Sequence, residues 1–194
     1  YGEKETRGLF LVKNSDISQT NASNKDIQQK LSEEAKQAFE KAPNSIEILS
    51  HLPYTTMFIN EVVRLYPPVP IFGRTALEED HWNGFKIPKG MLVITSPYVI
   101  HRNKKYWKDP NKFDPERHTK DKMKGMPPFS YFPYGGGPRI CIGMGYAQIQ
   151  LPLTVASLVK DFDFINDNNK KIELKPSITL GTKSPIILKI KKRS

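Results

Sequence analysis

Apolar residues recur at helical spacing in three stretches of the chain. In the first, over 25–41, they fall four residues apart, and Asn24 just before it is suited to cap a helix. The second runs from about 53 to 65, begins with a proline that favours a first helical turn, and ends before Pro67 and Pro68. The third covers about 144–160. The pattern therefore predicts three helices.

Short stretches with strand character lie between and after these helices. They cover 74–77, 85–87 and 91–96, with turns at 83–84 and 88–90. Three more cover 161–165, 172–180 and 186–190, and we expect these to close on themselves as a hairpin. Residues 106–133 have an irregular pattern, and residues 1–24 are expected to form a loose N-terminal segment. The sequence thus predicts a mainly α fold with small β-sheets (α+β), in one region over 25–194.

The net charge bears mainly on possible partners. The 194 residues include 30 Lys and Arg against 20 Asp and Glu, a net charge of +10, which suits nucleic acid, an anionic membrane or an acidic protein. No nucleic-acid-binding motif and no basic stretch with interleaved aromatic residues is present, so we expect no nucleic-acid partner. Part of the charge lies in 189–193, which is expected to be a solvated end.

The sequence carries no sign of export or of a membrane span. It has no run of 18 apolar residues and no visible signal peptide, which predicts an intracellular chain with no transmembrane segment. Because residue 1 is Tyr and not Met, we expect a longer protein, and membrane attachment is left open.

The only cysteine, Cys141, stands in a glycine-rich stretch, 134–143, just before the third predicted helix. A disulfide needs a second cysteine, so this thiol is either an inert buried group or a reactive or ligating one. The glycines at 135–137 suit a sharp turn or the close approach of a flat group. Arg139 and the electropositive start of the helix favour thiolate over thiol. These neighbours favour a soft metal ligand over an inert thiol.

The stretch resembles the haem-binding loop of the cytochromes P450, written F-x-x-G-x-R-x-C-x-G. Gly137, Arg139, Cys141 and Gly143 match it, and Tyr134 replaces the Phe while keeping an aromatic ring. The resemblance implies that Cys141 is the axial thiolate of a haem iron (iron-protoporphyrin IX) and that Arg139 pairs with a haem propionate. Thiolate ligation pushes electron density onto the iron and favours O–O cleavage.

The predicted helix over 53–65 carries Glu61 and Arg64, which are three residues apart and therefore meet on one face. Alone this is an ordinary surface pair, but the rest of the helix is apolar, which predicts a buried one. In the family a downstream arginine completes the pair, and Arg117, within a Pro-Glu-Arg run, matches it. His118 stands where the family has an aromatic residue, a difference expected to loosen the local packing.

The resemblance also suggests functional roles for a few residues that could equally have an ordinary structural role. His101 is expected either to meet a haem propionate or to lie exposed in a loop. Val69 and Ile71 are expected either to face the substrate or to pack in the core. The family's central helix carries an acid–Thr pair that helps deliver protons to oxygen, and it should precede residue 25. Thr6, after Glu5, is a weak catalytic candidate because its surroundings are polar and its spacing to the later helix is too long.

The resemblance covers about 25–191 and implies the C-terminal part of the cytochrome P450 fold. The implied function is a haem-thiolate monooxygenase, or a portion of one, that inserts one oxygen atom from O₂ into a small apolar organic substrate. Two electrons derived from NAD(P)H would arrive through an electron-donor protein of the reductase or ferredoxin type. Lys120, Lys122 and Lys124 would share one docking face if their segment is extended, or belong to a solvated loop. The alternative function is a non-catalytic, truncated fragment unable to hold haem.

Overall fold

The computed structural model describes residues 21–43, 46–165, 173–175, 177, 179–185 and 188–193, and for residues 21–25 only the backbone. Most of the segment predicted to be loose, and with it Thr6, lies outside the described residues.

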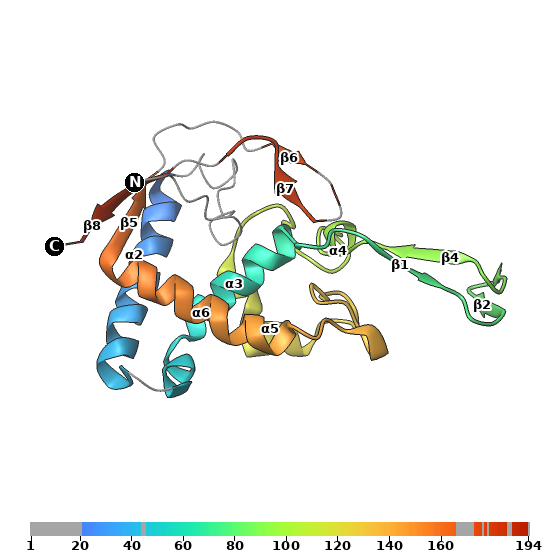
Figure 1. Ribbon diagram of the computed structural model, residues 1–194, viewed down its shortest axis with the longest axis horizontal. Helices are drawn as coiled ribbons and strands as arrows, with labels where there is room; N and C mark the ends of the chain where they lie inside the picture. The colour runs from blue at the N-terminus through green and yellow to red at the C-terminus, as the bar shows by residue number, and fades with distance from the viewer. Residues whose placement is uncertain are drawn as a thin grey trace.

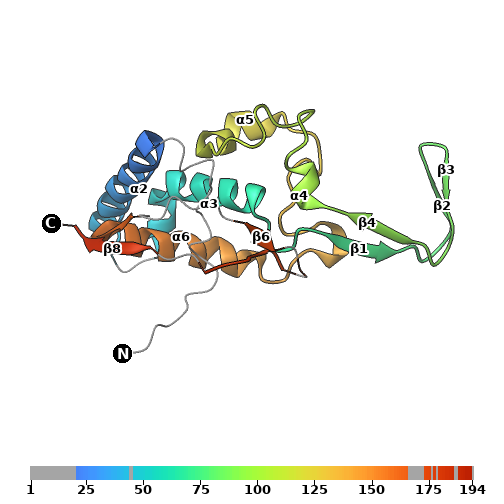
Figure 2. The same ribbon diagram turned by 90° about the horizontal axis from the view of Figure 1, so that it is seen from above.

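Three long helices form the body of the molecule. In it α2 (Asn21–Lys41) packs along α6 (Met144–Asp161), and α3 (Pro53–Leu65) contacts both (Figures 1 and 2). A short 3-10 helix, η1 (Ile46–His51), connects α2 to α3. The bounds of α3 agree with the predicted ones. In the described chain α2 begins at Asn21, four residues before the predicted start, so Asn24 lies inside the helix and does not cap it.

The hydrophobic core lies where α2, η1, α3 and α6 meet. Its buried apolar side chains are Leu31, Ala35, Ala38, Ala42, Ile48, Leu52, Ile59, Val155, Ala156 and Val159. The apolar face predicted for α2 points into this core, with Ile27 and Phe39 packed at its edge. None of the helices among the described residues combines the length and the apolarity that a membrane span requires.

The first turn of α3 is held by a carboxylate from α2. Leu52, at the N-cap position of α3, makes no side-chain hydrogen bond to the helix. Instead Glu34 accepts hydrogen bonds from the backbone N–H groups of Tyr54 (2.6 Å) and Thr55 (2.7 Å). Because the free N–H groups and the dipole at a helix start attract negative charge, this contact ties α3 to α2.

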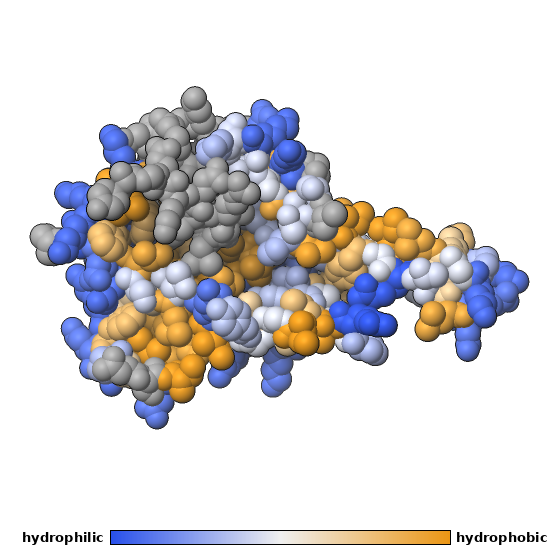
Figure 3. All heavy atoms as spheres, viewed as in Figure 1, coloured by the Kyte–Doolittle hydropathy of each residue, from blue (hydrophilic) through white to orange (hydrophobic). Residues whose placement is uncertain are grey.

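A β arm projects from the helical body (Figures 1 and 2). In it β1 (Phe72–Thr75) pairs antiparallel with β4 (Leu92–Thr95), and β2 (Asp80–Trp82) pairs with β3 (Phe85–Ile87). The turn predicted at 83–84 joins β2 to β3, and Asn83 and Gly84 both have positive φ (48° and 83°), as a two-residue hairpin loop requires. β2 was not predicted, and β1 begins two residues earlier than expected. Apolar residues line the arm as well as the body in Figure 3.

The segment predicted to be irregular contains short helices. They are η2 (Pro115–His118) and α5 (Lys120–Lys124), and two more flank the segment, α4 (Pro97–Ile100) and η3 (Gly137–Arg139). The helical α5 corrects the expectation of an extended lysine segment. Since residues two apart in a helix point in different directions, Lys122 faces away from the side shared by Lys120 and Lys124. Its Nζ donates a hydrogen bond to the backbone oxygen of Glu116 (2.8 Å).

The last strands form two separate pairs, not the single hairpin that was predicted. β5 (Phe162–Ile165) pairs with β8 (Lys189–Lys192), and β6 (Leu174–Lys175) pairs with β7 (Gly181–Thr182). All four residues of β8 are exposed, so the prediction of a solvated end is confirmed, although these residues form a strand. Arg193 beyond it forms an ion pair with Asp163 (2.6 Å).

Candidate functional site

The loop that carries Cys141 is closed by its own backbone. The N–H of Cys141 donates to the carbonyl of Tyr134 (2.9 Å), and the N–H of Met144 donates to the carbonyl of Cys141 (3.1 Å). Gly135 and Gly137 have φ of 77° and 70°, which favours glycine at both positions. The loop leads into α6, whose N-cap is Gly143. The thiol of Cys141 is exposed, so the interpretation as an inert buried thiol is wrong.

The surface around the thiol is apolar and open. Ile142 is fully exposed, and Ile140 beside it in the sequence and Tyr146 on the next turn are exposed too. Phe129, which packs against Gly136 of the same loop, is also exposed. A side chain built at Gly137 would meet no atom within 4 Å. Together with a soft sulfur donor, these features suit a large, flat, apolar group with a metal at its centre. The residues of this loop therefore fit a haem.

Two cations lie at the edge of this surface. Arg139 is exposed on η3, one residue before Ile140 and two before the thiol. Arg74, on β1, donates from Nη2 to the backbone oxygen of Arg139 (3.5 Å). Sequence reasoning missed Arg74, because the only signal was an isolated arginine in a predicted strand. The two guanidinium groups could pair with the carboxylates of an acidic ligand.

A close approach, and not its backbone angles, favours glycine at position 136. A Cβ at this position would lie 2.6 Å from the ring of Phe129. Phe129 itself has a φ of 58°, which is rare for a bulky residue and holds its ring over the loop. The outer side of the glycine stretch is therefore packed against an aromatic ring.

Tyr134 is half-buried at the start of the loop. Its burial raises the pKa of the hydroxyl above the usual range, and the negative charge of a Cys141 thiolate acts in the same direction. The hydroxyl is therefore neutral near pH 7, so the site carries no second negative charge at this position.

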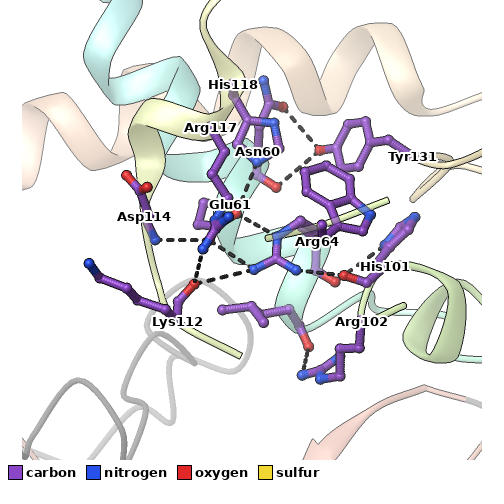
Figure 4. Close-up of polar contacts among 12 residues, drawn as sticks. Asn60, Glu61, Arg64, His101, Arg102, Lys112, Asp114, Arg117, His118 and Tyr131 are labelled. Carbon is purple, nitrogen blue, oxygen red and sulfur yellow. Dashed lines mark hydrogen bonds and ion pairs between the residues drawn. The ribbon is translucent and has the colours of Figure 1, made fainter. Parts of the chain in front are cut away.

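Behind the loop, Glu61 and Arg64 form a fully buried ion pair on α3 (Figure 4). Arg64 Nε donates to Oε2 of Glu61 (2.7 Å) and Nη2 donates to Oε1 (2.9 Å), a two-point contact between the planar groups. The Arg64 guanidinium also stacks on the ring of Trp107, 4.9 Å from its centroid. Buried charges need such additional partners to offset the loss of water.

Three further groups converge on Glu61 from the segment before α5, namely the backbone N–H of Asp114 and the side chains of Arg117 and His118 (Figure 4). The backbone N–H of Asp114 donates to Oε1 of Glu61 (2.9 Å). Arg117 forms an ion pair with the same oxygen, at 3.5 Å from its Nε. The guanidinium of Arg117 also donates to the carbonyls of Lys108 and Asp109. Burial alone would raise the pKa of Glu61, but the hydrogen bonds from Arg64 and His118 outweigh it and the pKa lies below the usual range. Glu61 is therefore a carboxylate.

His118 adds a contact to this cluster. It is buried, and its Nε2 lies 3.0 Å from Oε2 of Glu61, to which it donates because the carboxylate can only accept. The expectation that a histidine here loosens the packing is wrong, since the ring fills the aromatic position and also satisfies a lone pair of Glu61.

His101 is fully buried, so the interpretation as an exposed loop residue is wrong. Its Nδ1 lies 3.2 Å from the backbone oxygen of Arg64, and its Nε2 accepts a hydrogen bond from the N–H of Phe132 (2.9 Å). Both ring nitrogens are thus occupied by backbone groups. As placed here, the ring has no nitrogen left for a haem propionate.

Val69 and Ile71 lie between α3 and β1 and are 40% and 51% exposed. The interpretation that they pack in the core is therefore wrong. They remain candidates for contact with a substrate.

Comparison with known proteins identifies the family. A profile of the cytochrome P450 family matches residues 22–190, and the chain therefore belongs to the cytochrome P450 family. The predicted fold class, helices with small antiparallel sheets, is confirmed.

Similar proteins include several members of one P450 group. Cytochrome P450 3A16 of Mus musculus is 37% identical over 172 residues, and Lithocholate 6-beta-hydroxylase of Mesocricetus auratus is 38% identical over 172 residues. Each of these matches covers 87% of this chain and 34% of the relative. Cytochrome P450 3A19 of Capra hircus aegagrus is 35% identical over 176 residues, or 89% of this chain and 80% of that protein. The chain thus spans about a third of the length of the first two relatives.

Proposed function

We propose that this chain is the haem-binding part of a monooxygenase, with Cys141 as the thiolate ligand of the iron. The observation that carries the proposal is the exposed thiol in a self-closed glycine loop at the start of α6. Membership of the cytochrome P450 family supports it.

The remaining residues of the site divide into those that hold the haem and those that hold the loop. Arg139 and Arg74 would neutralise the propionates, since both cations lie at the edge of the apolar surface. Gly137 and Gly143, with Tyr134, shape the loop so that the sulfur faces outward. Glu61, Arg64 and Arg117 form the rigid support behind it.

When bound, haem supplies the activation of O₂, and the protein contributes its position and its electronic environment. The reaction we propose inserts one oxygen atom into a small, apolar organic substrate. One relative is named for 6-beta-hydroxylation of lithocholate, which is an oxygen insertion. Val69 and Ile71 are exposed apolar side chains that could contact such a substrate.

The two electrons for this reaction would come from NAD(P)H through an electron-donor protein. A net charge of +10 favours a donor with an acidic docking face, because opposite charges steer the encounter. Lys120 and Lys124, which share one side of α5, are candidates for such a face.

A second candidate function is a fragment that binds no haem, which is considered because the chain spans about a third of the length of the first two relatives. Mixing the purified chain with haem, reducing it and adding CO separates the two. A Soret band at the position of thiolate-ligated haem supports the proposal, whereas the spectrum of free haem supports the fragment.

A further inference from the structure

We infer that His101 is a positioning residue, which ties the buried Glu61–Arg64 pair to the start of the loop that presents Cys141. This inference rests on the proposed function, because in that function the loop has to present Cys141 to the haem iron. His101 does not touch the thiol, and its effect would be transmitted through the backbone of Phe132.

The first half of the tie is a reciprocal contact between His101 and α3 (Figure 4). Arg64 donates from Nη1 to the backbone oxygen of His101 (2.5 Å), while the His101 ring contacts the backbone oxygen of Arg64 (3.2 Å). Each side chain thus bonds to the backbone of the other residue. Because Arg64 is itself fixed by Glu61, the position of His101 is set by the ion pair.

The second half joins the ring to the loop. The N–H of Phe132 can only donate, so Nε2 of His101 is an acceptor and the ring proton lies on Nδ1, where it donates to Arg64. Phe132 in turn accepts a hydrogen bond from the N–H of Gly135 (3.0 Å), and Tyr134 accepts one from Cys141 (2.9 Å). These hydrogen bonds, joined by the covalent structure of Arg64 and Phe132 and by the peptide group between Tyr134 and Gly135, connect the carboxylate of Glu61 with the amide of Cys141.

The rings around His101 limit how it can move. Its ring lies 5.2 Å from that of Tyr131 and 5.3 Å from that of Phe132, centroid to centroid. Tyr131 donates from its hydroxyl to the backbone oxygen of Asn60 on α3 (3.0 Å). Packing and hydrogen bonding thus hold the imidazole in the one orientation that serves both partners.

Two substitutions separate the two bonds. His101→Asn places an amide near Nδ1 and keeps the contact to Arg64, but it removes the acceptor for Phe132. His101→Gln places an amide oxygen near Nε2 and keeps the acceptor for Phe132. His81→Asn, at an exposed histidine of the arm, is the matched control.

The measurement is residue-resolved amide hydrogen exchange on the full chain without haem, at Phe132 and Cys141. We expect His101→Asn to speed exchange at both amides by about tenfold, the effect of losing one hydrogen bond, with the α2–α6 core unchanged. His101→Gln and His81→Asn should exchange like the parent. Parental exchange at both amides in His101→Asn would overturn the inference.

If His101→Asn does not fold, His101→Gln decides the question. A folded Gln variant with parental protection at Phe132 supports the role, and one that loses it at both amides overturns it. If neither variant folds, the ring is a general core residue and the specific role is overturned. Because the exchange is read without haem, a parent chain that takes up no haem would count against the proposed function and leave the test of His101 intact.

Discussion

At the scale of single residues, the main feature of the molecule is a buried carboxylate with a complete set of partners. Glu61 is fully buried and contacts Arg64, Arg117, His118 and the backbone N–H of Asp114. Such a charge costs several kcal/mol to bury unless its partners are in place. The cluster therefore stabilises the fold only as a unit, and removing one member leaves the others without compensation.

The substitution Glu61→Ala should destabilise the chain by about 3–5 kcal/mol, because it leaves Arg64 and Arg117 side by side without a counter-charge. Chemical unfolding and haem content after reconstitution are the measurements, with Glu40→Ala on the exposed side of α2 as control. Parental stability and haem content in Glu61→Ala would show that the cluster stabilises neither the fold nor the binding of haem.

His101 makes the stability depend on pH. Burial lowers the pKa of His101 from 6.5 to about 4, and the charges of Arg64 and Arg102 act in the same direction, against the hydrogen bond to Arg64. Between pH 6.5 and 4, His101 is protonated in the unfolded chain but neutral in the folded chain. Stability therefore falls as the pH falls through this range. The loss attributable to this residue should reach about 3 kcal/mol between pH 7 and pH 4.

Urea unfolding at a series of pH values, in the parent and in His101→Gln, isolates this contribution. The parent should lose more stability on acidification than the variant, because the Gln side chain does not titrate. Parallel curves for the two proteins would mean that His101 does not carry the effect.

At the scale of elements, the structure depends on contacts that one element supplies to another. The start of α3 lacks a cap of its own, and Glu34 of α2 takes that place. Similarly, Phe129 packs over Gly136, so an irregular segment shapes the thiolate loop from outside.

Replacing Glu34 with Ala should destabilise the chain by about 1–2 kcal/mol, the usual range for the loss of a helix cap. The neighbouring Glu33→Ala is a matched control, because Glu33 is exposed and its carboxylate accepts a hydrogen bond from Gln29 of the same helix. Equal unfolding midpoints for the two variants would contradict the capping role.

The substitution Gly136→Ala should cost about 1–3 kcal/mol, because its Cβ would overlap the ring of Phe129. The same substitution in a Phe129→Ala background should cost far less, since Gly136 has extended backbone angles (φ −165°) that alanine adopts freely. A double-mutant cycle in thermal unfolding measures the difference. An equal cost in both backgrounds would place the strain elsewhere.

At the scale of the whole molecule, sequence reasoning recovered the parts that local patterns encode. The bounds of α3 follow from Pro53 at one end and Pro67 at the other, and the resemblance to a family singled out Glu61, Arg64 and Arg117. The pairing of β5 with β8 joins segments more than twenty residues apart, which no local pattern specifies.

The contacts of His101 and Glu34 were missed for a related physical reason. Their partners are backbone N–H and carbonyl groups, which every residue carries, so the sequence contains no mark of them. The prediction for His118 was wrong because it considered only how well the ring packs in a position where the family has an aromatic residue. The ring of His118 also donates a hydrogen bond to Glu61.

The central claim is that Cys141 is the haem ligand of this chain, and one comparison tests it most directly. The reduced CO spectrum of the haem-loaded parent is set beside those of Cys141→Ser and Cys141→His, with far-UV circular dichroism to confirm that all three fold. A hydroxyl is a poor ligand for iron at neutral pH, whereas imidazole binds it, so the two variants separate loss of ligation from loss of fold. We predict that the parent shows the band of thiolate-ligated haem, that Cys141→Ser loses it without unfolding, and that Cys141→His moves it to the position of imidazole-ligated haem. A parental spectrum in folded Cys141→Ser would contradict the assignment.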